Sequence, residues 1–211
     1  MFYKNILYVI PQYWYGFASA FSGQTLYESW LYQGYNIVFT AFPIMWFAIF
    51  DQEFEKREFV KDPYLYWIGI SDACYSYAKL WRIVFQAIGN ALIIDLFVFW
   101  SLNGTSIDNK RGETGCFWES ATLVYACVVI VANLFILQRT NTHTVGSTLL
   151  IVLSIALFFV CFWFENLFFF FYDVWSIFPE LMGNFKTYTI IVVTCFFTMG
   201  QDAVKSRYKQ R

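Results

Sequence analysis

The sequence predicts an all-α, polytopic membrane helix bundle, and three observations support that prediction. Of the 211 residues, 59% are hydrophobic and 24% are aromatic, and the mean hydropathy is +0.49. Only 14% are charged, whereas a typical soluble domain has about 25%. Apolar runs close to the roughly 20 residues that a helix needs to cross a bilayer recur along the whole chain. Because these runs do not alternate apolar with polar residues, they favour helices over a β-barrel.

We expect six spans, each identified by a long apolar run. Pro11 in the first span and Pro43 in the second predict kinks, because neighbouring groups in a membrane bundle can satisfy the carbonyls that proline frees. The polar segment 51–82 is predicted to be a loop, and 201–211 a basic tail. The six spans are predicted near 3–21, 31–50, 83–102, 117–137, 145–164 and 188–200.

Lysine and arginine give the expected orientation of these spans. Ten of them fall in the segment 51–82, the link after the fourth span and the tail, whereas three fall on the opposite side. Because basic residues concentrate in cytosolic loops, we expect the 51–82 loop and both ends of the chain to be cytosolic. The net charge of −1 identifies no partner, and we expect no nucleic-acid binding.

Residues for other kinds of chemistry are few. The five cysteines are scattered without a CxxC pair, and we interpret them as buried, reduced thiols. The single histidine, His143, lies in a polar link, so no histidine pair can build a metal or acid–base site. The sequence contains no GxxxxGK[ST] nucleotide-binding motif. We therefore expect no catalytic residue, no metal ligand and no cofactor bound by this chain itself.

Lys4 lies within the first predicted span, and Asp95 lies well inside the third. A cation at the centre of a spanning helix costs about 2.5–3.5 kcal/mol, so Lys4 either extends to the cytosolic interface as an anchor or has a role at depth. Asp95 should face the bundle interior or be protonated. One carboxylate without a partner is a poor cation site. A structural hydrogen bond of Asp95, involving Asn90, is therefore the simpler interpretation.

Several motifs follow one another at a definite spacing in the first third of the chain. They are FYKN (Phe2–Asn5), FSGQ (Phe21–Gln24), YNIVFTAFP (Tyr35–Pro43), IFDQ (Ile49–Gln52) and PYLY (Pro63–Tyr66). In this order they resemble the carboxy-terminal membrane region of the type IV P-type ATPases, the phospholipid flippases. The resemblance is specific over Phe2–Tyr66 and looser after it, with no residue-level match beyond about Leu102. Pro11 departs from the family's pattern.

The resemblance implies that the chain carries spans five to ten of a ten-span P-type ATPase. The phosphorylated aspartate, the nucleotide-binding domain and the actuator domain would lie in an amino-terminal part that this sequence lacks. ATP and Mg²⁺ would serve that full-length enzyme. The implied function is to move a phospholipid, and specifically an aminophospholipid, from the exoplasmic to the cytosolic leaflet of the plasma membrane or of a Golgi or endosomal membrane.

The resemblance also implies partners and a substrate path. The partners are phospholipid, the lipid bilayer, the missing ATPase domains and a two-span accessory β-subunit. That subunit would contact outer loops such as Ser22–Trp30 and Asn103–Glu119. The family's lysine that matches Lys4 lies mid-helix and is implicated in lipid transport, which implies an electrostatic role for Lys4 and a hydrogen-bonding role for Asn5. A desolvated ammonium beside an amide can bind the phosphate of a headgroup.

Three further polar residues are candidates for this path. Asn36 and Thr40 are four residues apart, so we expect them to share one helix face. They either line the path or make hydrogen bonds between helices. Gln12 lies about two turns from Lys4 and has the same two interpretations.

Two other functions are open at this point. A cation-pumping P-type ATPase would share the fold, but the fixed ammonium of Lys4 repels cations. A stand-alone six-span scaffold or channel would need an authentic start at Met1. An in-frame DKTG coding stretch upstream of Met1 would instead indicate a P-type ATPase.

Overall fold

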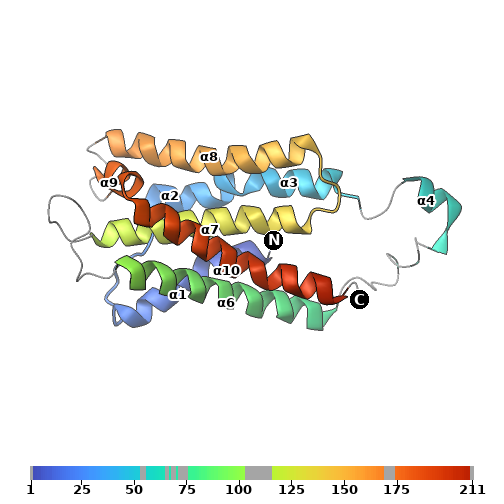
Figure 1. The fold of residues 1–211 in the computed structure, drawn as a ribbon, viewed down its shortest axis with the longest axis horizontal. Helices are drawn as coiled ribbons and strands as arrows, with labels where there is room; N and C mark the ends of the chain where they lie inside the picture. The colour runs from blue at the N-terminus through green and yellow to red at the C-terminus, as the bar shows by residue number, and fades with distance from the viewer. Residues whose placement is uncertain are drawn as a thin grey trace.

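Helices form all the regular structure in the part of the chain that the structure describes. The computed structural model describes residues 2–52, 56–64, 67, 70, 76–102, 116–168 and 174–209 (Figure 1). This architecture confirms the predicted all-α class. The elements are α1 (Phe2–Ala18), α2 (Ser29–Gly34), the π-helix η1 (Tyr35–Phe39), α3 (Ala41–Phe50), α4 (Lys56–Lys61), α6 (Tyr77–Leu102), α7 (Phe117–Arg139), α8 (Val145–Leu167), α9 (Ile177–Gly183) and α10 (Phe185–Lys209).

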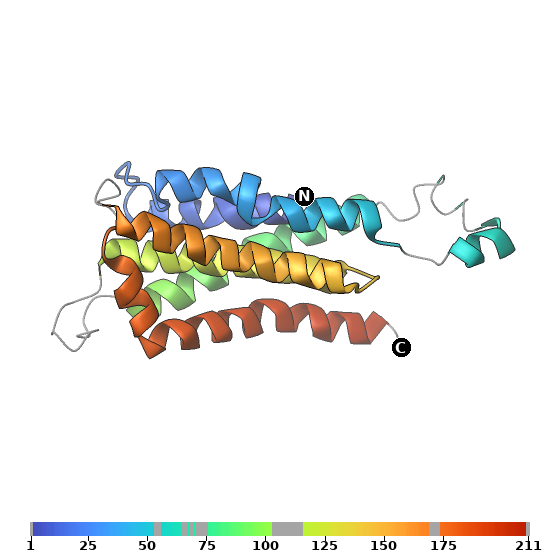
Figure 2. The same cartoon turned by 90° about the horizontal axis from the view of Figure 1, so that it is seen from above.

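The long helices lie side by side, with α7 in contact with most of the others (Figures 1 and 2). α1 packs along α6, α8 packs against α3, and α10 contacts both α6 and α7. Every residue of α7 from Ser120 to Val129 is buried, as are Val131, Ala132 and Asn133. This stretch is rich in alanine, valine and other small side chains, which let membrane helices approach closely. α7 is therefore the central support of the bundle.

The number of membrane crossings is smaller by length and composition than the sequence predicts. Within the part of the chain that the structure describes, four segments are long and apolar enough to span a bilayer: Ser29–Phe50, α6, α7 and α8. α9 and α10, which are bent by 73° relative to one another, add a fifth if they form one broken span. α1 has 17 residues, somewhat fewer than the roughly 20 that a full crossing needs. The chain is a multi-pass membrane protein, but the predicted count of six is not confirmed.

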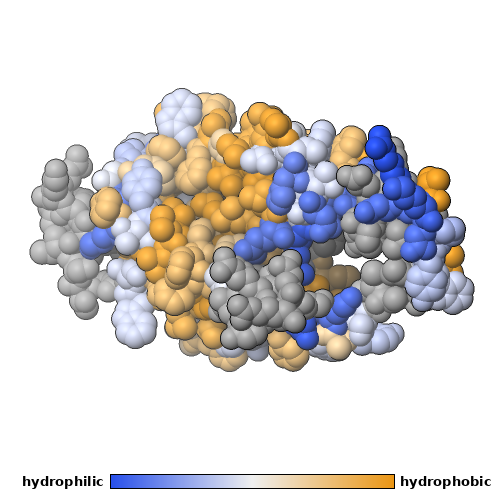
Figure 3. All heavy atoms as spheres, turned by 45° about the vertical axis from the view of Figure 1, so that its right-hand side comes forward, coloured by the Kyte–Doolittle hydropathy of each residue, from blue (hydrophilic) through white to orange (hydrophobic). Residues whose placement is uncertain are grey.

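The surface has the distribution of side chains that a bilayer requires. Apolar side chains cover the middle of the face shown in Figure 3, and hydrophilic ones gather toward one end. On α8, for example, Leu149, Val152, Val160 and Trp163 are exposed. A water-soluble protein rarely exposes a continuous apolar surface of this kind, so we interpret it as the lipid-facing surface.

The end of the first helix differs from the predicted span. α1 ends at Ala18 rather than at Phe21. Ala20 and Phe21 adopt left-handed φ values of 51° and 54°, which an α-helix does not accommodate. The Phe21 amide donates instead to the Gly16 carbonyl at 2.8 Å. A tight turn therefore follows α1 and leads the chain back toward α2.

Two later helices extend into segments predicted to be polar connections. α6 begins at Tyr77, within the predicted 51–82 loop, and α10 begins at Phe185 and continues to Lys209 through most of the predicted tail. Helices continue past the hydrocarbon where basic side chains can reach the water interface. The short helix α4 lies in the same loop. Two residues of the PYLY motif, Leu65 and Tyr66, lie outside the described residues.

Candidate functional site

The lysine of α1 points into the bundle. Lys4 is only 9% exposed, and Thr40 is completely buried. The Nζ atom of Lys4 donates a hydrogen bond to Oγ1 of Thr40 at 2.9 Å. An anchoring lysine would extend its ammonium to the water interface, whereas this one is held against the second predicted span. An ammonium has three N–H donors, and the bond to Thr40 uses one of them.

Tyr35 completes a set of mutual contacts around Lys4. Its hydroxyl donates to the Lys4 carbonyl at 2.9 Å, and Lys4 Nζ lies 5.8 Å from the centroid of its ring. The Thr40 hydroxyl donates to the Tyr35 carbonyl at 2.7 Å. Because that bond uses the hydroxyl proton, the Thr40 oxygen is oriented to accept from the ammonium. Lys4, Tyr35 and Thr40 therefore fix one another's positions.

The second predicted span is broken where it meets Lys4. η1 is a π-helix, and Thr40 follows it with a φ of −135° and a ψ of −6°, outside the helical region. Pro43 has no N–H, so it cannot supply the helical donor for the carbonyl of Phe39, four residues before it. The side-chain amide of Asn133, on α7, donates to this carbonyl at 3.0 Å. The sequence predicted a kink from Pro43, and the structure places the break just before this proline.

Tyrosine hydroxyls satisfy two more carbonyls of the broken span. Tyr8 of α1 donates to the Tyr32 carbonyl at 3.1 Å, and Tyr125 of α7 donates to the Leu31 carbonyl. Irregular backbone at membrane depth is tolerated only where protein or water satisfies its polar groups. The Leu31 carbonyl also accepts the backbone N–H of Tyr35, so the two tyrosines add donors from α1 and α7 to the second span.

A cluster of four buried tyrosines adjoins this break, namely Tyr8, Tyr27, Tyr35 and Tyr125. The Tyr8 ring stacks on Tyr35 at a centroid distance of 4.1 Å and on Tyr27 at 5.0 Å. Tyr125 meets Tyr27 and Tyr35 edge-on. The four residues come from α1, the following loop, η1 and α7, so no periodicity in the sequence joins them. Sequence reasoning missed this cluster for that reason.

The polar residues predicted to lie beside Lys4 divide into two groups. Thr40 binds Lys4, whereas the side chains of Asn5 and Asn36 are exposed. The expectation that Asn36 and Thr40 share a face is not met, because Asn36 is exposed and Thr40 is buried. Thr40 lies just beyond η1, and its φ of −135° departs from helical geometry. Gln12 is partly buried. The structure thus brings Lys4 and Thr40 together and leaves Asn5 and Asn36 on the surface of this chain.

The expected bond between Asn90 and Asp95 is also wrong. The Asn90 amide donates to the hydroxyl of Tyr3 at 2.8 Å. Asp95 is 6% exposed, and its carboxyl oxygens have no hydrogen-bond partner among the described residues. Tyr3 precedes Lys4 and stacks on the Phe135 ring of α7 at 3.6 Å. Asn90 therefore ties α6 to the turn of α1 that carries Lys4.

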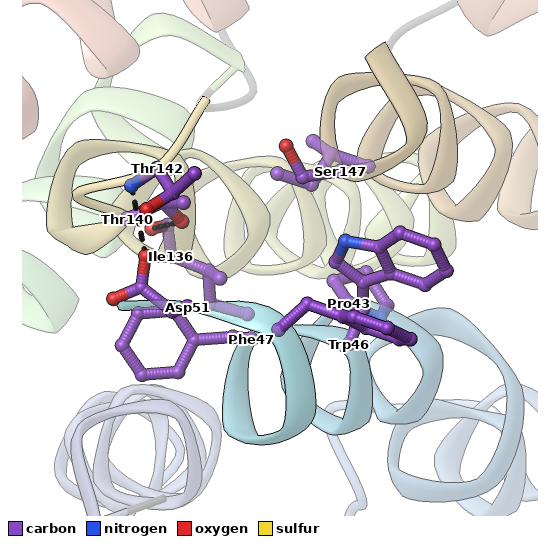
Figure 4. Close-up of a pocket in the computed structure, with 10 residues that line it drawn as sticks. Pro43, Trp46, Phe47, Asp51, Ile136, Thr140, Thr142 and Ser147 are labelled. Atoms are coloured by element: carbon purple, nitrogen blue, oxygen red, sulfur yellow. Dashed lines mark hydrogen bonds between the residues drawn. The ribbon is translucent and has the colours of Figure 1, made fainter. Parts of the chain in front are cut away.

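A small pocket lies between α3, α7 and α8 (Figure 4). Asp51 borders it, and its Oδ1 accepts the backbone N–H groups of Asn141 and Thr142, each at 2.9 Å. This carboxylate holds the α7–α8 link, so we interpret the pocket as a packing gap beside an anchor and not as a ligand site. Its lining includes Pro43, Trp46, Phe47, Ile136, Thr140 and Ser147.

Comparisons with known proteins identify one family. A family model described as the phospholipid-translocating P-type ATPase C-terminal region matches residues 1–211. Phospholipid-transporting ATPase C887.12 of Schizosaccharomyces pombe is 28% identical over 214 residues, which cover 96% of this chain and 16% of that protein. Phospholipid-transporting ATPase DRS2 of Saccharomyces cerevisiae is 32% identical over 130 residues, which cover 62% of this chain and 10% of that protein.

A human relative shows the same partial coverage. Phospholipid-transporting ATPase IC of Homo sapiens is 27% identical over 161 residues, which cover 75% of this chain and 12% of that protein. The chain therefore spans less than a fifth of the length of each of these three relatives.

Proposed function

Because the chain belongs to the carboxy-terminal membrane region of the phospholipid-translocating P-type ATPases, we propose that it forms the transport half of a flippase membrane domain. In this role it helps to move a phospholipid, specifically an aminophospholipid, from the exoplasmic to the cytosolic leaflet. One observation carries the proposal: the buried ammonium of Lys4 is held against the break of a spanning helix by Thr40. This arrangement supplies a positive charge at membrane depth.

The chemistry of Lys4 suits the headgroup of a phospholipid. A phosphate that leaves water needs charge and hydrogen bonds to replace its hydration, and an ammonium supplies both. The N–H groups that are not directed at Thr40 can approach phosphate or carboxylate oxygens. Val9, Tyr13 and Ile37 are exposed on the same two segments. These side chains would let acyl tails remain in lipid while the headgroup crosses.

We assign hydrogen-bonding roles in the path to Asn5 and Asn36. Asn5 follows Lys4 and Asn36 follows Tyr35, so each exposed amide adjoins a buried member of the site. Such amides can donate to and accept from a headgroup without disturbing the packing of the bundle. Thr40 acts from within by orienting the ammonium. Gln12, which is partly buried, would contribute farther along α1.

Energy for transport would come from domains outside this chain. The described residues contain no group of three or more His, Cys, Asp or Glu side chains that could hold a metal ion. We assign ATP, Mg²⁺ and the phosphorylated aspartate to those domains. A two-span accessory β-subunit would contact the outer loops. Of these loops, Ser22–Trp30 lies within the described residues, whereas 103–115 lies outside them.

We also propose an orientation and a location. The α4 helix of the basic loop and the end of α10 lie at the same end of the bundle (Figure 1), which supports a shared cytosolic side. α1 begins within the bundle and runs away from that end (Figure 1), so its amino-terminal end would be directed toward the cytosolic side. The protein would act in the plasma membrane or in a Golgi or endosomal membrane.

Membership of this family disfavours the two other functions. A cation pump would place acceptor ligands, not the ammonium of Lys4, at the break of a spanning helix. A stand-alone scaffold or channel gives no reason for burying Lys4 against Thr40.

The test is lipid-stimulated ATP hydrolysis by the full-length protein with its β-subunit, measured with phosphatidylserine, phosphatidylethanolamine and phosphatidylcholine. We expect an aminophospholipid to stimulate hydrolysis. Lys4→Ala should raise the lipid concentration for half-maximal stimulation about tenfold or more, which corresponds to the loss of one charged hydrogen bond. Lys61→Ala, at the exposed end of α4, is the control. Stimulation by no phospholipid, or a Lys4→Ala variant equal to the control, would overturn the proposal.

A further inference from the structure

We propose that Asn133 of α7 is a positioning residue for transport, because it holds the break of the second span in the conformation that places Thr40 against Lys4. This inference rests on the proposed transport role of Lys4. Asn133 acts through the backbone, since its amide nitrogen lies 3.0 Å from the carbonyl oxygen of Phe39. It would therefore tune the affinity of the site for lipid through Thr40.

The environment of Asn133 shows which of its atoms matters. The residue is completely buried, and its Nδ2 also donates to the Val129 carbonyl of its own helix at 2.9 Å. Its Oδ1 is buried without a hydrogen-bond partner among the described residues. An unpaired buried oxygen is unfavourable, and asparagine is a poor helix former. The stabilising contribution of this side chain must therefore come from its amide nitrogen.

The carbonyl that Asn133 binds controls the conformation of Thr40. The carbonyl of Phe39 belongs to the peptide group that joins Phe39 to Thr40, so the orientation of this group sets the φ of Thr40. Pro43 removes the helical donor for this carbonyl. Without Asn133 the buried carbonyl would have to turn toward another donor. That rotation would move the Thr40 hydroxyl away from Lys4.

The contact also couples the site to the central helix. Asn133 and Phe39 are 94 residues apart in the sequence, and α7 contacts α1 as well as α3. Tyr125 of the same helix binds the Leu31 carbonyl on the other side of the break. A small shift of α7 relative to η1 would therefore break the hydrogen bond to the Phe39 carbonyl. Thr40 would then be free to move away from the ammonium of Lys4.

The experiment compares variants of the full-length protein with its β-subunit. Phosphoenzyme formation from ATP reports the catalytic domains, and the phosphatidylserine concentration for half-maximal dephosphorylation reports the lipid site. Asn133→Leu removes the amide at similar volume. We expect unchanged phosphoenzyme formation and a half-maximal lipid concentration about tenfold higher, as for the loss of one buried hydrogen bond.

A second variant separates positioning from folding. Pro43→Ala restores an N–H that can bind the Phe39 carbonyl and straighten the span, so it competes with Asn133 while this carbonyl keeps a donor. We expect the same loss of apparent lipid affinity with no loss of thermal stability. Asn166→Leu on α8 is the matched control, because the Asn166 amide donates to the Val174 carbonyl at 2.8 Å, away from the break.

The outcomes distinguish this inference from the proposed function. Wild-type dephosphorylation that no phospholipid stimulates would overturn the proposed function. If the wild type responds to lipid and Lys4→Ala weakens the response, a wild-type lipid affinity in either Asn133→Leu or Pro43→Ala would overturn the positioning role alone. An Asn166→Leu variant with an equal loss would also overturn it, because the effect would then be one of general packing.

Discussion

Tyr35 and Lys4 contact each other through both backbone and side chain. The Tyr35 hydroxyl donates to the Lys4 carbonyl at 2.9 Å, and the ammonium of Lys4 lies 5.8 Å from the centre of the Tyr35 ring. A cation within about 6 Å of an aromatic face is attracted to it. α1 and the broken span are therefore joined at the residue that we place in the transport path.

Replacing Tyr35 by phenylalanine should remove the hydrogen bond to the Lys4 carbonyl and keep the ring. The buried Lys4 carbonyl would lose one donor, which costs about 0.5–1.5 kcal/mol of stability. We expect a lower unfolding temperature for the purified full-length protein in detergent. Tyr13→Phe is the control, since Tyr13 is exposed on the same helix. Equal unfolding temperatures for the two variants would show that the Tyr35 hydroxyl contributes nothing.

Gly146 should not accept a larger side chain. A Cβ atom at this position would lie 2.8 Å from Cζ2 of Trp46, and the Trp46 ring is itself packed on Phe50 at 4.2 Å. Gly146→Ala is therefore expected to cost about 1–3 kcal/mol, as for other overpacked sites. Thermal unfolding again measures the effect.

Gly89 is the control for that substitution. A Cβ atom there meets nothing within 4 Å, and the residue lies in the interior of α6. Gly89→Ala should be neutral or stabilising by up to about 1 kcal/mol, because alanine is the better helix former. If Gly146→Ala proved as stable as Gly89→Ala, the close packing of α8 on α3 would be refuted.

Asp51 should determine the order of the link between α7 and α8. Its carboxylate accepts three N–H donors, which are the backbone and side-chain amides of Asn141 and the backbone amide of Thr142. Asp51→Ala removes these charge-assisted bonds, each typically worth about 1.5–3 kcal/mol. We expect faster hydrogen exchange of the Asn141 and Thr142 backbone amides.

The control for that experiment is Asp62→Ala. Asp62 accepts the backbone N–H of Tyr64 at 3.0 Å in the predicted 51–82 loop. Its replacement by alanine should therefore leave the α7–α8 link unchanged. Unaltered exchange at Asn141 and Thr142 in the Asp51→Ala protein would mean that other contacts order the link.

Hydropathy predicted much of the fold because it reports transfer into lipid. The apolar runs identified α7 and α8, which begin at Phe117 and Val145. It did not predict that η1 would interrupt the second span. Asn133 and Tyr125 donate to carbonyls of this span from a distant helix. A local pattern cannot contain that information.

The candidate site was predictable only in part. Lys4 was identified because an ammonium within an apolar run is costly, and Thr40 because it is polar. Their contact joins residues that are 36 apart in the sequence, and Thr40 is buried whereas Asn36 is exposed. The failure of the predicted Asn90–Asp95 bond has a similar cause, because Tyr3 of another helix takes the Asn90 amide.

The most direct test of the central claim is a double-mutant cycle on Lys4 and Thr40 in the full-length protein. Lys4→Met and Thr40→Val, singly and together, would be compared by the phospholipid concentration for half-maximal ATP hydrolysis. If Thr40 acts by orienting the ammonium, Thr40→Val should raise this concentration about tenfold in the presence of Lys4 and hardly at all in its absence. Two effects that simply multiply in the double variant would contradict a shared role for these residues in lipid transport.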